Sequence, residues 1–221
     1  MSFRIRHLPI LLAVATLAAC STDSITGAPA TAELPQPRPN FSVVYSSASD
    51  PALLALFESE KARVAREQET SKDKYEELLR EWKKLNRSYM LGKHNLLYCE
   101  PQPYTATVKI VGPEGAALDF GPHRLDVPAN ALAGYTVITA EVPVSLSVST
   151  KFSPHGTTFG ATPKLALSYK HCSRPSSLSE RVVYTNGVEG EILETPPSSD
   201  DTVNSRAFAW LSHFSIYALA E

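Results

Sequence analysis

The sequence lacks the short motifs that mark several large classes of enzyme. It contains no Gly-x-Ser-x-Gly, no Walker loop and no Gly-x-Gly-x-x-Gly, the signatures of serine hydrolases, P-loop proteins and dinucleotide-binding proteins. Its six histidines include no His-x-x-x-His pair and no acidic partner at ligand spacing. We therefore expect no metal site and no cofactor.

The sequence also lacks an excess of positive charge and, beyond its N-terminus, a long apolar segment. Lys and Arg number 21 against 23 Asp and Glu, which gives a net charge of −2. This mild acidic balance gives no reason to expect a nucleic-acid partner. No stretch after residue 20 is apolar for long enough to cross a bilayer.

The N-terminus has the three-part layout of a secretory signal peptide. Arg4 and Arg6 precede a run without charge, residues 8–17, and the run leads into Leu17-Ala18-Ala19-Cys20. The run is too short to span a membrane. The ending resembles the bacterial lipobox, in which the cysteine is acylated and becomes the first mature residue. An ordinary cleaved signal peptide with an incidental Cys20 is the alternative.

The lipobox resemblance implies both an attachment and a compartment. Acyl chains on Cys20 would hold the protein on a membrane, since each buried CH2 contributes about 0.8 kcal/mol. The second mature residue is Ser21 and not aspartate. By the usual sorting tendency of bacterial lipoproteins, this favours the outer membrane, on its periplasmic or surface face. Loss of Arg4 and Arg6 leaves 19 basic against 23 acidic residues, a net charge of −4.

Cysteine is scarce, and its distribution is informative. Of three cysteines, only Cys99 and Cys172 remain once Cys20 is set aside. In an exported chain, two such residues predict a disulfide. Two separate buried thiols are the alternative.

Composition divides the chain into four segments. Residues 1–19 form the lipoprotein signal peptide and residues 20–48 a lipid-anchored tether, which is rich in proline and therefore extended. Residues 49–98 are a helical segment and residues 99–221 a β domain.

The helical segment begins at a strong start signal. Asp50 can cap the helix, with Pro51 at the first helical position, and the pattern runs to about Leu91-Gly92. Residues 58–74 are dense in charge with almost no apolar stripe, which indicates either a solvated helix or an arm that binds a partner.

The second half of this segment is amphipathic. Its apolar positions recur at helical spacing: Tyr75, Leu78, Leu79, Trp82, Leu85 and Tyr89. So much apolar surface must pack either on the β domain or on a second copy of the chain.

From Tyr104 onward the apolar period becomes two. Four apolar sets alternate with polar residues: Ala106, Val108 and Ile110; Ile138, Ala140 and Val142; Val144, Leu146 and Val148; and Leu165, Leu167 and Tyr169. Asn186-Gly187 marks a hairpin, and residues 207–211 and 213–219 read as the last strands, with residues 195–205 as a polar loop between hairpin and strands. The pattern predicts a mainly β fold preceded by a long amphipathic helix. The strands are expected to form an antiparallel sandwich in which each sheet has one solvent-exposed face.

Four ordered segments of the β region resemble the ZU-five domain, a β-sandwich module of zonula occludens proteins, netrin receptors and ankyrins that also appears in bacterial exported proteins. The segments are Ile110-Val111-Gly112-Pro113-Glu114-Gly115, Leu125-Asp126-Val127-Pro128-Ala129-Asn130-Ala131-Leu132, Phe152-Ser153-Pro154-His155-Gly156 with Pro163-Lys164-Leu165, and His213-Phe214-Ser215. The second segment carries Asn130 where the family has glycine, and asparagine tolerates a left-handed backbone. The resemblance covers about residues 104–219.

His213-Phe214-Ser215 is the one motif that suggests a chemical reaction. In some relatives the same tripeptide cleaves itself between Phe and Ser. The resemblance implies that the Ser215 hydroxyl would attack the Phe214 carbonyl, with His213 as base. The alternative is structural: Phe208, Trp210, Phe214 and Ile216 are core residues of the closing strands, and His213 and Ser215 lie on the opposite face.

A small β-sandwich without enzyme motifs is usually a binding or structural module. We therefore expect an exported lipoprotein that is not an enzyme, attached to a membrane through Cys20, with a protein partner or a role in envelope architecture. Self-processing at Phe214–Ser215 is the second hypothesis. An uncharacterised hydrolase or a glycan-binding protein is the third.

Overall fold

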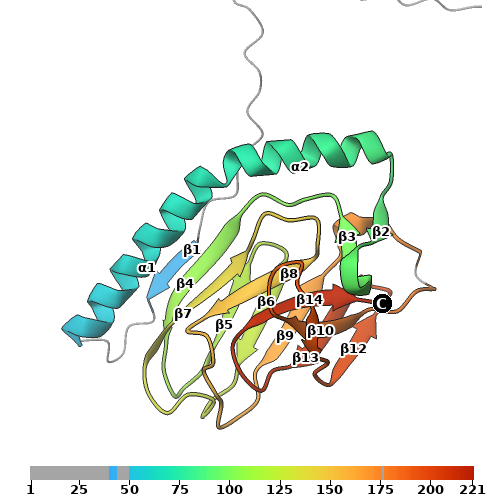
Figure 1. Ribbon diagram of the computed structural model, residues 1–221. Coiled ribbons are helices and arrows are strands. Elements are labelled where there is room, and N and C mark those ends of the chain that lie inside the picture. Colours follow the sequence, from blue (N-terminus) through green and yellow to red (C-terminus); the bar gives the residue numbers. More distant parts are fainter. Residues whose placement is uncertain (1–39, 44–49, 176) are drawn as a thin grey trace, which may run out of the picture. The chain divides into compact units, whose positions relative to one another are not determined.

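The computed structural model describes residues 40–43, 50–175 and 177–221 (Figure 1). Cys20, the predicted signal peptide and residues 20–39 and 44–48 of the predicted tether lie outside these residues. The described part consists mainly of antiparallel strands in a sandwich-like arrangement, with helices on its N-terminal side. The predicted fold class is confirmed. Among the described residues, no helix combines the length and the apolar character needed to cross a membrane.

Two large sheets form the sandwich, and a small one stands beside them. The seven-stranded sheet has the order β1 (Asn40–Val43), β4 (Thr105–Val111), β7 (Thr136–Val142), β8 (Ser149–Ser153), β14 (Ile216–Ala220), β10 (Arg181–Thr185), β11 (Ile192–Glu194). The five-stranded sheet has the order β12 (Ser198–Asp201), β13 (Arg206–Trp210), β9 (Lys164–Ser168), β6 (His123–Val127), β5 (Ala116–Phe120). The small sheet pairs β2 (Tyr89–Leu91) with β3 (Leu97–Cys99).

The main core lies between the two large sheets. From the seven-stranded sheet it takes Ile138, Ala140 and Val142, which is one of the predicted alternating sets. Leu165 and Leu167 come from β9 of the facing sheet. The predicted hairpin at Asn186-Gly187 is present as the antiparallel pair β10 and β11.

Two helices replace the single predicted one. Helix α1 (Pro51–Thr70) begins as expected, with the Ala52 N–H donating to the Asp50 carboxylate at 2.9 Å. Helix α2 (Lys72–Leu85) follows the junction at Ser71, and it ends at Asn86 and not at Gly92. Asn86 takes a left-handed conformation (φ 50°), which stops the helix. Tyr89 therefore lies on strand β2 and not on the helical stripe.

Helix α1 covers the outer face of β4 and β7, beside which it runs in Figure 1. Its buried Phe57 and Val64 pack in one cluster with Val108 and Ile110 of β4. The expectation of one solvent-exposed face per sheet is wrong for this sheet. The apolar set of β4 faces the helix and not the sandwich core, because α1 supplies a second apolar layer.

The polar residues of β4 consequently face inward, toward β5 of the other sheet. The Thr107 hydroxyl donates to the Asp119 carbonyl at 2.6 Å, and the Lys109 ammonium donates to the Ala117 carbonyl at 3.1 Å. Backbone oxygens of the facing edge strand thus satisfy these side chains, which removes the cost of burying them.

The charged stretch 58–74 also docks on the sheet. Arg63 forms a salt bridge at 2.9 Å with Glu141 of β7, which is only 3% exposed and also accepts from the Tyr104 hydroxyl at 2.6 Å. Glu60 accepts from Thr139 of the same strand at 3.1 Å. A fully solvated helix does not describe this face, because part of its charge is used inside the fold. That the stretch binds a partner stays a prediction.

Three further expectations need correction. Residues 144–148 form an irregular connection and not a strand, with the Ser145, Ser147 and Ser149 hydroxyls linked to one another. The predicted polar loop 195–205 contains strand β12. In β13 the core residues are Ala207 and Ala209, whereas Phe208 is half-buried and Trp210 is 41% exposed.

Candidate functional site

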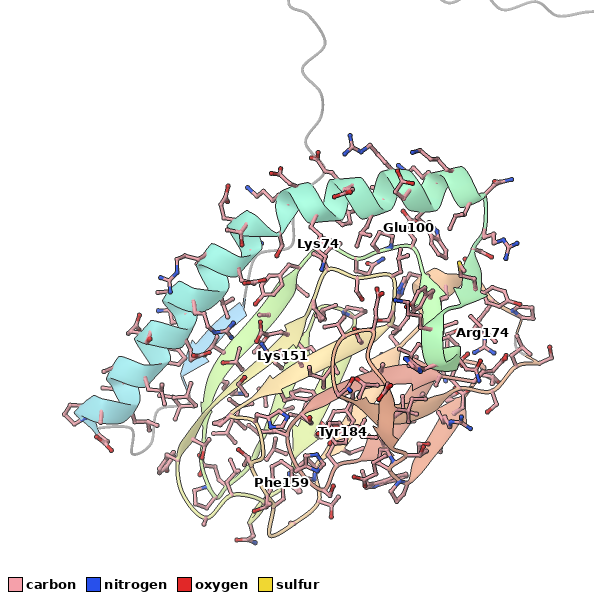
Figure 2. All side chains as sticks on the ribbon, viewed as in Figure 1. Lys74, Glu100, Lys151, Phe159, Arg174 and Tyr184 are labelled. Atoms are coloured by element: carbon pink, nitrogen blue, oxygen red, sulfur yellow. A yellow bond between two sulfur atoms is a disulfide. The ribbon has the colours of Figure 1, made fainter. Side chains whose placement is uncertain are left out.

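The tripeptide His213-Phe214-Ser215 lies in the connection between β13 and β14. Phe214 is fully buried, and its ring contacts Phe152 of β8 at 5.4 Å and Phe159, labelled in Figure 2, at 4.8 Å between centroids. Phe214 is therefore the core residue that the sequence predicted.

The Ser215 hydroxyl is bonded to a histidine that sequence reasoning had passed over. Ser215 is fully buried, and its Oγ lies 2.8 Å from Nε2 of His155, which is exposed in the turn after β8. His213, the base implied by the resemblance, has a different partner, because its Nδ1 lies 2.9 Å from the Ser212 hydroxyl. Its ring meets Tyr184, also labelled in Figure 2, edge-on at 4.9 Å.

A signal for His155 was present in the sequence. It belongs to Phe152-Ser153-Pro154-His155-Gly156, one of the four segments similar to the ZU-five domain. Sixty positions separate it from Ser215. Spacing along the chain therefore gives no indication that the two side chains meet.

The peptide group between Phe214 and Ser215 is held by the same turn. The Phe214 carbonyl accepts from the Gly156 N–H at 2.9 Å, and the Phe214 N–H donates to the Thr157 carbonyl at 3.0 Å. On the other side, the Ser215 carbonyl accepts from the Phe152 N–H at 2.9 Å. Gly156 has a positive φ of 78°, which favours glycine at this position.

These contacts supply the parts that an acyl transfer needs. There is a hydroxyl next to the carbonyl, an imidazole bonded to that hydroxyl, and an N–H donor on the carbonyl oxygen, where negative charge would develop. The arrangement is also compatible with a purely structural role, in which the turn 152–157 fastens the start of β14.

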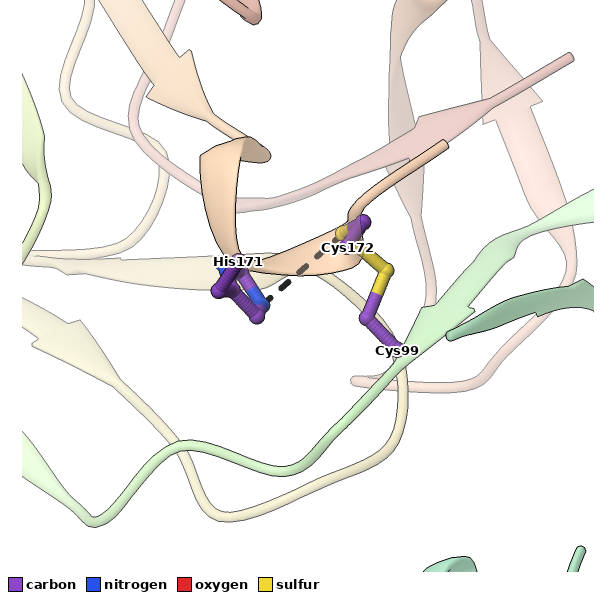
Figure 3. Close-up of side chains that lie close together, drawn as sticks. All are labelled: Cys99, His171 and Cys172. Atoms are coloured by element: carbon purple, nitrogen blue, oxygen red, sulfur yellow. Dashed lines mark hydrogen bonds between the residues drawn. A yellow bond between two sulfur atoms is a disulfide. The ribbon is translucent and has the colours of Figure 1, made fainter. Parts of the chain in front are cut away.

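The predicted disulfide is present. Cys99, the last residue of β3, is bonded to Cys172 in the 3-10 turn η2 (Lys170–Cys172), and both are fully buried (Figure 3). Nε2 of His171 lies 3.9 Å from the Cys172 sulfur.

These three residues are also the one group in the described part whose side chains are close enough to hold a metal ion together. A zinc site made from this group would need both cysteines as thiolates, and both sulfur atoms are used in the disulfide. In the oxidised protein the group therefore offers a single imidazole.

His123 is a core residue. It is buried, its Nδ1 accepts from the Ser168 N–H at 3.0 Å, and burial lowers its pKa to about 3. The ring is thus neutral at pH 7 and serves as a hydrogen-bond acceptor between β6 and the end of β9.

No family model matches this chain, and no curated protein matches it. The resemblances to the lipobox and to the ZU-five domain therefore remain predictions from the residues themselves.

Proposed function

We propose that the protein is an exported lipoprotein, anchored to a bacterial membrane through Cys20, whose ZU-five-like sandwich serves protein contacts or envelope architecture. The observation that carries the proposal is the Cys99–Cys172 disulfide. Bonds of this kind persist in oxidising compartments outside the cytosol. The bond uses both cysteines of the folded part and leaves Cys20 for acylation.

The packing of the helices supports the structural half of the proposal. Helix α1 covers the outer face of β4 and β7, and Trp82 of α2 lies in one cluster with Val183 of β10 and Ala218 of β14. The seven-stranded sheet is therefore braced near both of its ends. Such bracing suits a module that must keep its shape on a membrane surface.

Replacing the anchor residue tests this proposal. We expect Cys20→Ala to abolish acylation, so that the protein is recovered without detergent, whereas the wild type carries acyl mass and sediments with membranes. Fatty-acid labelling followed by mass spectrometry of the mature protein is the measurement. The matched control is Cys99→Ala/Cys172→Ala, which lacks the disulfide and should still be labelled. A wild type without acyl mass, with Cys20→Ala still in the membrane fraction, would contradict the anchor.

A second function, self-processing at Phe214–Ser215, is favoured by the Ser215–His155 hydrogen bond. When Nδ1 of His155 carries the ring proton, Nε2 can accept the hydroxyl proton as Oγ attacks the Phe214 carbonyl carbon. The Phe214–Ser215 amide bond then breaks, and its nitrogen takes the proton from the imidazolium. Water opens the resulting ester to give a Phe214 carboxylate and a Ser215 hydroxyl. The Gly156 N–H would stabilise the oxyanion.

The place of β14 decides how cleavage must be observed. This strand is paired on one side with β8 and on the other with β10. A cleaved segment, Ser215 to Glu221, would therefore stay in the sheet of the folded protein. Cleavage would be visible only after unfolding.

We expect an intact mass measured in denaturant to show two fragments that meet at Phe214–Ser215. Ser215→Ala removes the nucleophile and His155→Ala removes the base, so both should leave one full-length mass. His213→Ala is the matched control and should still cleave. A wild type that keeps a single full-length mass after long incubation rejects self-processing. Cleavage that is lost in His213→Ala and kept in His155→Ala would return the role of base to His213.

A further inference from the structure

A cleft opens between the C-terminal end of α2 and the turn that carries the disulfide. It measures about 540 Å³, within the range of small-molecule sites. One wall comes from α2 and the residues after it, and the other from Glu100 and from η2. Figure 2 shows Glu100 under the second half of α2. The lining residues are Trp82, Lys83, Asn86, Arg87, Ser88, Glu100, His171 and Ser173.

The cations of this cleft are unpaired. Within residues 50–175 and 177–221, neither the Lys83 nor the Arg87 side chain forms a hydrogen bond or an ion pair. The neighbouring Lys84, which does not line the cleft, is paired with Glu81 at 2.7 Å. Lys83 lies in the last turn of α2, and Arg87 follows Asn86, where the helix ends.

The charge balance of the cleft favours an anion. Burial lowers the pKa of His171, so this ring is neutral at pH 7. Lys83 and Arg87 then contribute two positive charges against one negative charge on Glu100. The Ser88 and Ser173 hydroxyls and the Asn86 amide add neutral hydrogen-bond donors.

We propose that this cleft binds the phosphoryl group of a small phosphate ester. A guanidinium presents two parallel N–H donors to phosphate oxygens, and an ammonium adds a point charge. The volume exceeds that of the phosphoryl group itself, which leaves room for the organic part of the ester. A soluble metabolite and a lipid head group share this chemistry.

The disulfide holds the second wall of the cleft in place. Glu100 directly follows Cys99, and His171 and Ser173 flank Cys172. The bond therefore joins the two segments that face α2 across the cleft. We expect Cys99→Ala/Cys172→Ala to bind the same ester more weakly, because this wall is then free to move.

Titration with glycerol 3-phosphate at low ionic strength tests the site. The full chain with Cys20→Ala and Trp210→Phe retains Trp82 as its single tryptophan, so its fluorescence reports on the cleft. We expect saturable binding that glycerol does not reproduce. Lys83→Glu and Arg87→Glu, at exposed positions, should each weaken it about tenfold or more, since each removes a charge-assisted contact. Lys84→Glu is the matched control and should change the affinity less than about twofold.

Vesicles of phosphatidylglycerol, with vesicles of phosphatidylcholine as control, distinguish the sources. Binding to the former that depends on Arg87 assigns the ester to a lipid head group, and binding to glycerol 3-phosphate alone assigns it to a soluble compound. The absence of saturable binding to both probes would overturn the proposal. So would equal losses in Lys84→Glu and Lys83→Glu, because the effect would then be general electrostatics.

Discussion

Removing the Cys99–Cys172 disulfide is expected to lower the free energy of unfolding by about 4 kcal/mol, an upper bound in the chain-entropy model. The bond closes a loop with a sequence separation of 73, so it greatly restricts the unfolded chain. For a chain of this size, the loss corresponds to a fall in melting temperature of roughly 10 °C. Thermal unfolding of Cys99→Ala/Cys172→Ala beside the oxidised wild type measures it.

Treatment with a reductant separates the contribution of the disulfide bond to stability from that of the packing of the two side chains. Both cysteines are fully buried in the main core, so their replacement also removes sulfur atoms from packed surroundings. Reduced wild type should melt close to the double variant, and reductant should leave the double variant unchanged. If reductant lowers both melting temperatures equally, or neither, the stabilisation does not come from the bond.

Trp82→Ala is expected to destabilise the protein by about 3 to 5 kcal/mol. The indole is 3% exposed and packs with Leu96, Tyr98, Val183 and Ala218, which join α2 to the small sheet and to β10 and β14. The truncation leaves a cavity between helix and sandwich that rigid strands cannot close. Denaturant unfolding should show a lower midpoint in one cooperative transition.

Trp210→Ala is the matched control for this prediction. The Trp210 side chain is 41% exposed on β13, so its truncation should cost less than about 1 kcal/mol. Trp82→Ala should show the same loss at every protein concentration, since the indole packs within one chain. A melting temperature that rises with protein concentration would show instead that Trp82 packs at an interface between two copies of the chain. An unchanged curve would contradict the packing itself.

Local patterns predicted the elements of the fold but not all of their ends. The start of α1 depends on Asp50 and Pro51, which act on their own neighbours, so the sequence placed it correctly. The end of α2 depends on the left-handed conformation of Asn86 and on the pairing of β2 with β3. That pairing is a contact between two segments, and local spacing does not report it. The predicted helical stripe therefore extended to Tyr89.

The candidate site shows the same division. Sequence reasoning identified Ser215 and Phe214 because they stand together in a tripeptide. It assigned the base to His213, the adjacent histidine, whereas the fold brings His155 to the hydroxyl from a different turn. Which imidazole lies next to the Ser215 hydroxyl is decided by the pairing of β8 with β14 in one sheet, and no spacing along the chain predicts it.

The sequence by itself determined the class of fold, the start of the helical segment and the pairing of Cys99 with Cys172. Each follows from local periodicity, a local cap or a count of residues. Only the tertiary structure decided which face of β4 is inward. Alternation separates apolar from polar residues along a strand, but it does not say which neighbour the apolar face meets. Here Val108 and Ile110 meet α1, and Thr107 and Lys109 find their partners in backbone oxygens of the opposite sheet.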